Sequence, residues 1–204
     1  MAKKFITGLL VGVTLLSLSG CDTSGGTKEV REAREAEVAK EAKGPEFVLR
    51  VNCAASEPYT DKAGNEWLPD QYMEQGSKWG AVGGSTVERG DLGIAGTDAP
   101  KIYETERYSM EAYKFMVPNG KYEVRLHFAE TYSGITGEAE RVFSVTINGQ
   151  TALKDFDPFK EGGGFQKPVV KKIEGLAVTN GELVIEFTPN IQNPEINGIE
   201  IISE

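Results

Sequence analysis

The residue types that carry most hydrolytic and metal chemistry are scarce in this chain. His127 is the single histidine among 204 residues, and Cys21 and Cys53 are the two cysteines. A Ser-His-Asp triad, a Cys-His dyad or a histidine-based zinc site would have to use that one ring. The alternation around His127 places it opposite the apolar side chains of its segment, so we expect it to be solvated. The sequence therefore argues against these three kinds of chemistry.

Carboxylates are abundant, with 31 aspartates and glutamates. A glycosidase needs only two of them, and a pair such as Glu106 and Glu130 keeps that reaction open. Asp61 and Asp70 are suitable ligands for a structural calcium ion, but two acids nine residues apart form no calcium motif. The glycines at 162–164 lack the Lys-Ser/Thr of a phosphate-binding loop. We therefore expect no cofactor, no nucleotide and no catalytic residue.

The start of the chain is typical of an exported bacterial lipoprotein. Lys3 and Lys4 precede an apolar run from Phe5 to Leu18, which is too short to span a bilayer, and small residues follow it. Leu18-Ser19-Gly20-Cys21 resembles the lipobox, in which the chain is cut before a cysteine that carries acyl chains such as palmitate. Residues 1–20 are thus predicted to be a signal peptide, and Cys21 the lipid anchor. This places the protein in the cell envelope outside the cytoplasm, on the inner or the outer membrane.

Residues 21–46 are predicted to be a tether. A Gly/Ser-bearing polar segment is followed, from Lys28 to Lys43, by a Glu-, Ala- and Lys-rich stretch with helix propensity and almost no apolar face, so the linker is helical or disordered. Removal of residues 1–20 takes away two lysines and no acid, which changes the net charge from −9 to −11 (20 basic against 31 acidic residues). This acidity argues against nucleic acid as a partner.

Residues 47–204 alternate apolar and polar side chains in short runs, which is typical of antiparallel strands. The clearest runs are 121–128, 143–147 and 183–187. Four Asn-Gly pairs, at 119–120, 148–149, 180–181 and 197–198, predict hairpins. About eight to ten strands fit an all-β fold, a two-sheet antiparallel β-sandwich of the jelly-roll or galactose-binding type. The stretch from Glu57 to Pro100 alternates little, and as a long loop it is the first place to look for a site.

Five segments stand out in order along the domain. They are Leu49-Arg50-Val51-Asn52-Cys53, Tyr103-Glu104-Thr105-Glu106-Arg107-Tyr108, Leu126-His127-Phe128-Ala129-Glu130-Thr131-Tyr132, Arg141-Val142-Phe143-Ser144-Val145-Thr146-Ile147-Asn148-Gly149, and Asn193-Pro194 with Ile196-Asn197-Gly198-Ile199-Glu200-Ile201. Together they resemble the malectin domain, a carbohydrate-binding β-sandwich. The resemblance covers residues 47–204 and implies a loop-end site for a glucose-rich oligosaccharide, without catalysis.

The resemblance also implies the ligand-binding residues. Tyr108 and Tyr132 stand where family members carry sugar-contacting tyrosines, and a phenol offers both a flat apolar face and a polar tip to a pyranose. Trp79 and Gly80 stand where the animal lectin has a tyrosine and a glycine that touch the sugar. Gln192 stands where that lectin has an acid, so a neutral amide replaces a charge-assisted acceptor.

Other positions have a structural interpretation beside the functional one. Ser133 replaces an aromatic residue of the animal lectin, and Asn193 is interpreted as a turn former before Pro194. Glu106, Arg107 and Glu130 are expected to form an ion-pair network that fixes the site loops. Trp67 is expected to plug the long loop onto the sandwich, and Cys53 to be a buried apolar residue.

The function favoured at this point is a non-catalytic carbohydrate-binding lipoprotein that captures oligosaccharide or glycan. Two alternatives stay open. Ser133 and Gln192 allow an envelope structural or protein-interaction module that has lost sugar binding, and the carboxylates allow a glycoside hydrolase.

Overall fold

The structure is a computed structural model that describes residues 30–31, 34 and 47–204. The chain divides into two compact units, Met1–Gly44 and Pro45–Glu204. The predicted signal peptide, the lipid anchor and most of the tether lie outside the described residues. The described residues of the first unit are helical and exposed. Within the described ranges, no helix is long and apolar enough to cross a bilayer.

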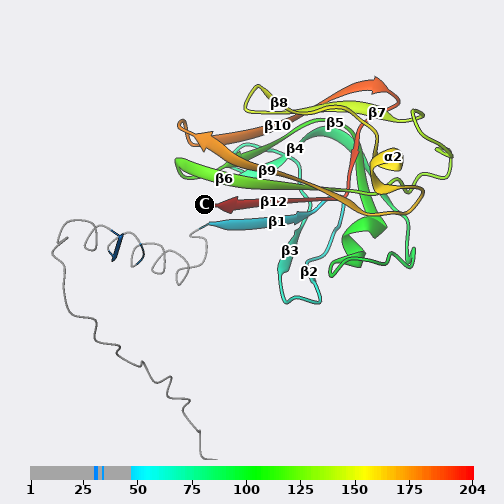
Figure 1. The fold of residues 1–204 in the computed structure, drawn as a ribbon, viewed down its shortest axis with the longest axis horizontal. Coiled ribbons are helices and arrows are strands. Elements are labelled where there is room, and N and C mark those ends of the chain that lie inside the picture. Colours follow the sequence, from blue (N-terminus) through cyan, green and yellow to red (C-terminus); the bar gives the residue numbers. More distant parts are fainter. Residues whose placement is uncertain (1–29, 32–33, 35–46) are drawn as a thin grey trace, which may run out of the picture. The chain divides into compact units, whose positions relative to one another are not determined.

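The second unit is an all-β sandwich, which confirms the fold class predicted from the alternation (Figure 1). It contains one short 3-10 helix, η1 (Pro100–Glu104), and one short α-helix, α2 (Pro158–Gly162). Its strands are β1 (Val48–Asn52), β2 (Tyr59–Thr60), β3 (Glu66–Pro69), β4 (Trp79–Glu88), β5 (Thr105–Met116), β6 (Gly120–Phe128), β7 (Val142–Ile147), β8 (Gln150–Phe156), β9 (Val169–Val178), β10 (Glu182–Ile191), β11 (Glu195–Ile196) and β12 (Gly198–Ser203).

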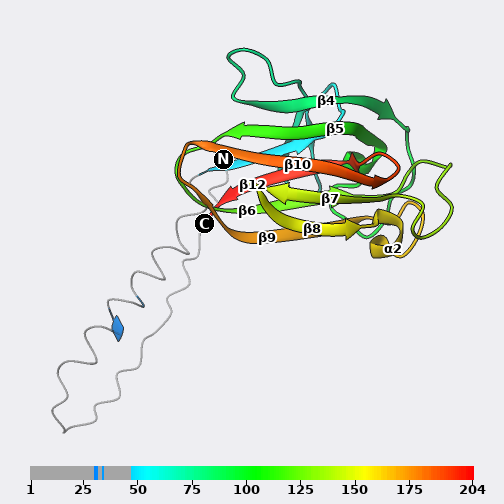
Figure 2. The same cartoon turned by 90° about the horizontal axis from the view of Figure 1, so that it is seen from above.

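The strands form two sheets of six. One has the order β2-β3-β1-β12-β6-β9, and the other has the order β11-β5-β10-β7-β8 with β4 paired to β5. Figure 2 shows the strands of this second sheet side by side from β4 to β8. All pairings are antiparallel except that of β1 with β3. The alternation seen in the sequence is what lets each sheet turn one apolar face inward.

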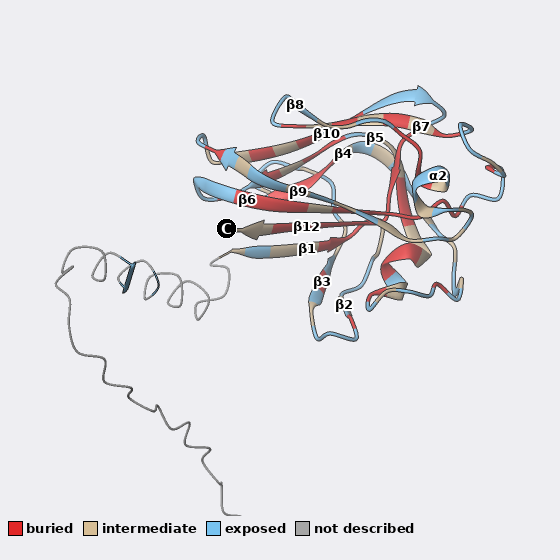
Figure 3. Ribbon diagram, in the orientation of Figure 1, coloured by how far each residue is buried: buried red, intermediate tan, exposed pale blue. Residues whose placement is uncertain are grey.

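The main core lies between the two sheets, where buried segments of facing strands meet (Figure 3). Phe128 on β6 reaches across to Phe143 on β7 and Phe156 on β8, with ring centroids 5.8 and 4.7 Å apart. Cys53 is fully buried in the same cluster, as predicted. No disulfide is needed to hold these sheets together, because a domain of about 150 residues buries roughly 70% of its chain surface on folding.

The four Asn-Gly pairs do not all make hairpins. Only the pair at 148–149 joins neighbouring strands: it links β7 to β8, and both residues have positive φ, as a type I′ turn requires. The pairs at 119–120, 180–181 and 197–198 each carry the chain from one sheet to the other. The expected hairpin is thus confirmed at 148–149 alone, and the pairs at 119–120 and 197–198 have no residue with positive φ.

The stretch from Glu57 to Pro100 is not a structureless loop, contrary to the expectation. It contains β2, β3 and the ten-residue β4, which pairs along almost all of β5. The sequence signal is weak because Gly83 and Gly84 interrupt the alternation with a register shift and positive φ values. A side chain at Gly84 would place a Cβ 2.8 Å from the backbone oxygen of Tyr108, so glycine permits the close approach of the two strands.

His127 is buried, which corrects the expectation of a solvated ring. A second small core of Trp67, Ile94, Ala99, Ile102, Tyr103 and Ala129 covers the outer face of β6 there. The His127 ring lies 3.0 Å from the Tyr103 hydroxyl and 3.0 Å from a Glu200 carboxylate oxygen, and Trp67 packs edge-on against it. Strand alternation predicts opposite faces, but it cannot show that a distant segment covers the second face. Trp67 therefore packs its segment against the sandwich, as was expected from the sequence.

Candidate functional site

A cleft of about 320 Å³ opens at one end of the sandwich. That volume is at the lower end of the range for small-molecule sites. Five segments supply its lining: the end of β4, the start of β5, the segment after β6, the approach to β7 and the turn after β10. The lining residues are Val87, Arg89, Glu106, Tyr108, Tyr132, Arg141, Gln192 and Asn193.

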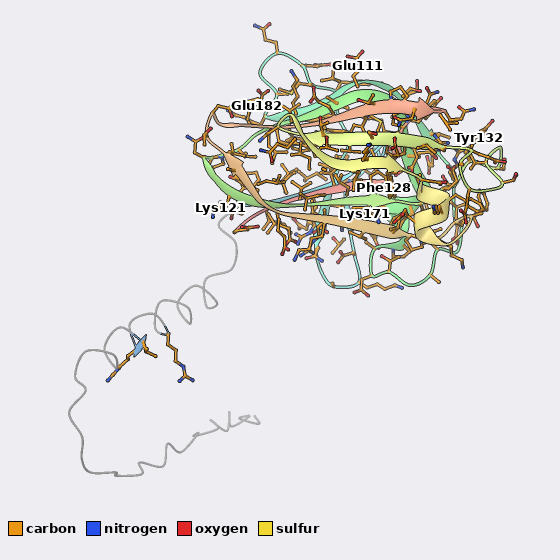
Figure 4. The ribbon with its side chains drawn as sticks, turned by 45° about the horizontal axis from the view of Figure 1, so that its top comes forward. Glu111, Lys121, Phe128, Tyr132, Lys171 and Glu182 are labelled. Carbon is orange, nitrogen blue, oxygen red and sulfur yellow. The ribbon has the colours of Figure 1, made fainter. Side chains whose placement is uncertain are left out.

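The cleft unites three of the five residues proposed for ligand binding. Tyr108, Tyr132 and Gln192 line it together, although they come from three separate segments. Figure 4 labels Tyr132 at one end of the sandwich and Lys121 and Glu182 at the other.

The structure does not bring Trp79 and Gly80 to this cleft. Trp79 pairs with Phe115 at the far end of β5, next to the residue that pairs with Glu182. Its ring is 8% exposed and stacks on Phe115 in the main core. A Cβ at Gly80 would lie 2.5 Å from the backbone nitrogen of Met73, so this glycine accommodates a crossing segment. Both residues therefore have a packing role in the structure.

The Tyr132 ring is the largest exposed apolar surface in the cleft. The residue is 45% exposed, and its backbone N–H donates to a Glu130 carboxylate oxygen at 2.9 Å. One side of the ring lies against Gly134, where a Cβ would approach the ring carbons within 2.5–2.6 Å. The Arg89 guanidinium carbon is 5.6 Å from the ring centroid. The ring is thus held in place while much of it faces solvent.

Gly134→Ala should therefore weaken ligand binding by about tenfold or more, because the new methyl group must displace the Tyr132 ring. The free energy of unfolding should change by less than about 1 kcal/mol, since both residues are exposed. Gly137→Ala is the matched control in the same loop, where a Cβ meets only Glu140, at 3.7 Å. Calorimetric titration of both variants makes the comparison, and equal affinities would show that the ring position is irrelevant to binding.

Two ion pairs form the floor of the cleft. Arg89 donates to Glu106 at 3.0 Å, and the same Glu106 oxygen accepts from the Thr131 hydroxyl at 2.8 Å. Glu106 is only 1% exposed. This pair joins the end of β4 to the segment that carries Tyr132.

The second ion pair supports two cleft segments at once. Arg141 donates through Nε to Glu130 at 2.6 Å and through a terminal nitrogen to the backbone oxygen of Asn193 at 2.5 Å. Glu130 in turn accepts from the Tyr132 backbone. Burial raises the pKa of Glu130, and Arg141 opposes that rise. Arg141 is thus a positioning residue for both Tyr132 and the turn after β10.

The predicted ion-pair network exists, but its arginines are different from the one expected. Arg107 does not pair with Glu106 or Glu130. It donates to Asp70 at 2.7 Å on the other side of β5, where Tyr113 also donates to Asp70 at 2.9 Å. Successive residues of a strand point to opposite faces, which is why Glu106 and Arg107 have separate partners.

The two acids considered for calcium are occupied by protein donors. Asp61 accepts from two backbone N–H groups, from the Asn65 amide and from the Trp67 indole N–H at 3.0 Å. Asp70 accepts from Arg107 and Tyr113, and from the Ala54 backbone at 2.6 Å. Among the described residues, no cluster of acids, histidines or cysteines is suited to hold a metal ion.

Glu195 lies on β11 opposite Tyr108 and is fully buried. Neither of its carboxylate oxygens has a hydrogen-bond partner among the described residues. Desolvation raises its pKa well above the usual value, and the charges of Glu106 and Glu130 act in the same direction against those of Arg141 and Arg89. Two arginines face three acids here, and the raised pKa of Glu195 favours its neutral form.

Glu195→Gln should stabilise the protein at neutral and alkaline pH. Because the pKa of Glu195 is raised on folding, the wild-type protein loses stability as the pH rises from the unfolded value, about 4.3, toward the folded one. Glutamine removes that loss, so the advantage of the variant should grow by up to about 1.4 kcal/mol per pH unit across this window. Below about pH 4 the two proteins should match. Urea unfolding at a series of pH values tests this, and a constant difference would contradict a buried neutral carboxyl.

Backbone strain accompanies the cleft. Ser109, next to Tyr108, has φ 58° and Gln192 has φ 59°, values that glycine adopts far more readily. The Ser109 N–H donates to the Pro194 oxygen at 3.0 Å, which ties the two strained segments together. Positive φ at non-glycine residues costs about 1–3 kcal/mol each and is concentrated at binding sites.

Sequence reasoning missed several residues that shape this cleft. Arg89 lay inside the supposed long loop, and Glu195 and Gly134 carried no motif of their own. Arg141 stood within a matched segment, but it had no assigned role. The available signal was charge in an otherwise apolar setting: Arg141 directly precedes the β7 alternation, and Glu195 lies in β11, just before the apolar strand β12.

The fold and the cleft define a β-sandwich with a loop-end site of small-molecule size. The chain belongs to the malectin domain family, because the family model described as malectin domain matches residues 47–199. Proteins named malectin, from Xenopus laevis and Mus musculus, are among its relatives.

Curated relatives match parts of the chain. Malectin-B of Xenopus laevis is 30% identical over 116 residues, which are 50% of this chain and 41% of that protein. A probable LRR receptor-like serine/threonine-protein kinase of Arabidopsis thaliana is 39% identical over 100 residues, which are 44% of this chain and 9% of the kinase. The match thus spans less than half of either relative. Receptor-like relatives are consistent with a location outside the cytoplasm.

Solved structures show the same sandwich. A Bacteroides uniformis β-glucuronidase 2 superposes with a TM-score of 0.69 and 28% identity, over 78% of this chain and 18% of that one. The ANXUR2 extracellular domain of Arabidopsis thaliana superposes with a TM-score of 0.62 and 22% identity, over 76% of this chain and 48% of that one, which shows the fold alone.

Proposed function

We propose that this protein is a non-catalytic, lipid-anchored carbohydrate-binding protein that captures oligosaccharide with the cleft of its malectin domain. The observation that carries the proposal is the convergence of Tyr108, Tyr132 and Gln192 in one cleft of suitable size. A pyranose presents an apolar C–H face and a rim of hydroxyls, and the site offers exposed phenol surface beside amide and guanidinium donors. The family resemblance supports a glucose-rich ligand, and one solved structure with the same sandwich belongs to a β-glucuronidase.

A glycosidase mechanism is disfavoured by the burial of the candidate carboxylates. Glu106 is 1% exposed and Glu130 is fully buried, and each is bonded to an arginine. A catalytic pair must flank the scissile bond, with one member able to donate a proton to it. Glu106 lines the cleft but is almost fully buried, and Glu130 is not among the lining residues.

A glycan array followed by calorimetric titration tests the function. The unit of residues 45–204, which is compact by itself, should bind gluco-oligosaccharides without shortening them. Binding to no glycan would favour the protein-interaction module, and shortened products would favour the hydrolase.

The anchor is tested separately in the full chain, where Cys21→Ser should move the protein from the membrane fraction to the soluble fraction.

A further inference from the structure

Arg89 is the charged residue of the cleft lining that reaches solvent. Its side chain is 23% exposed, whereas those of Glu106 and Arg141 are 2% and 5% exposed. The carboxylates behind the lining, Glu130 and Glu195, are fully buried. A ligand entering the cleft therefore meets an exposed cation, phenols and amides, whereas the one lining carboxylate among the described residues, Glu106, is almost buried and already accepts from Arg89 and Thr131.

The Arg89 guanidinium also has unused hydrogen-bonding capacity. It carries five N–H donors, and Glu106 is the one acceptor that the described residues offer its side chain. Its Nε is buried and unpartnered within that part of the chain. Because the planar fork of arginine matches a carboxylate in two-point geometry, this side chain can pair with a second anion while it keeps Glu106.

The position of Arg89 beside an aromatic ring narrows the ligand class further. Its guanidinium carbon lies 5.6 Å from the Tyr132 ring centroid, so an anion held there adjoins the stacking surface. A hexuronate combines the two required features, because its ring has an apolar face and its C6 carboxylate projects from the rim.

We propose that the cleft selects an oligosaccharide containing a hexuronate residue, whose carboxylate pairs with Arg89 while its sugar ring lies on Tyr132. This inference rests on the proposed carbohydrate binding and adds the substrate class. The net charge of −9 for the chain opposes an anion only weakly, since distant exposed charges are screened beyond a Debye length of about 8 Å at physiological salt.

The test uses matched disaccharide pairs in calorimetric titration of residues 45–204. Each pair consists of an α- or β-linked glucose disaccharide and the same disaccharide with its terminal glucose oxidised to glucuronate. The glucuronate member should bind about tenfold more tightly, and the preference should shrink in 1 M NaCl. Equal or better binding of the neutral member would overturn the hexuronate assignment and leave the proposed function intact. Binding of neither member would overturn both.

The variants assign the preference to one side chain. Arg89→Gln should weaken binding of the glucuronate disaccharide more than binding of the neutral one, so that the preference for glucuronate is lost. Arg125→Gln is the matched control, an arginine paired with Glu123 on β6 and outside the cleft lining. A preference that survives in Arg89→Gln would overturn the proposal. So would tighter binding of a 6-sulfated glucose disaccharide than of the glucuronate, which would make the ligand a sulfated sugar instead.

Discussion

Tyr132→Ala is expected to weaken oligosaccharide binding by at least about 30-fold, which would put a weak interaction beyond detection. The ring is the largest exposed apolar surface of the cleft, and aromatic anchors of this kind contribute about 2 kcal/mol or more to binding. The melting temperature should shift by less than about 2 °C, because the ring is 45% exposed and substitutions of exposed side chains change stability by about 0.5 kcal/mol or less.

Tyr59→Ala is the control for that experiment. Tyr59 is a half-buried tyrosine on β2 and is not part of the cleft lining. It should leave the affinity unchanged within about twofold while costing some stability. An unaltered affinity in Tyr132→Ala would remove Tyr132 from the site, and with it the aromatic platform on which the proposed function depends.

Arg141→Met should have the largest effect on stability, a loss of about 3–5 kcal/mol in the free energy of unfolding. Removal of one partner from a buried ion pair leaves the other charge uncompensated, and here Glu130 is fully buried. The Asn193 carbonyl also loses its donor. Urea unfolding of wild type and variant measures the change.

The double variant Glu130→Gln/Arg141→Met separates the charge from the contacts. Glutamine removes the uncompensated charge, so the double variant should be more stable than Arg141→Met alone. It should still bind ligand poorly, because the Tyr132 backbone and the turn after β10 lose their shared support. If the double variant is the less stable of the two, the cost of Arg141→Met lies in lost packing instead of in charge.

Local sequence patterns predicted much of the architecture. Period-2 alternation indicated the strands around 121–128 and 143–147 correctly, because burying one face of a sheet requires that spacing. The pair at 148–149 marked a tight turn in which both residues have positive φ, and Gly181 also has positive φ, whereas the pairs at 119–120 and 197–198 have none. These patterns could not predict which strands pair. Three of the four Asn-Gly pairs lead into the opposite sheet, which local sequence does not indicate.

The candidate site was predictable only in part. Tyr108, Tyr132 and Gln192 came from their resemblance to the family, and the structure places them in one cleft. Trp79 does not lie with them, because its pairing with Phe115 places it at the other end of β5. The sequence did not reveal this pairing, since the segment around Trp79 lacks regular alternation. Arg89 was not recognised as a site residue because it lies in the same irregular stretch.

By itself, the sequence determined the all-β class, the family and the shortage of residues for histidine or cysteine catalysis, because each follows from composition or from neighbours along the chain. Only the tertiary structure decided which charges lie together. Arg89, Glu106, Glu130, Arg141 and Glu195 span more than one hundred positions and meet at one end of the sandwich. The raised pKa of Glu195 and the exposure of Arg89 depend on burial, and burial is created by segments distant in sequence. The proposed preference of the cleft for a hexuronate depends on that arrangement.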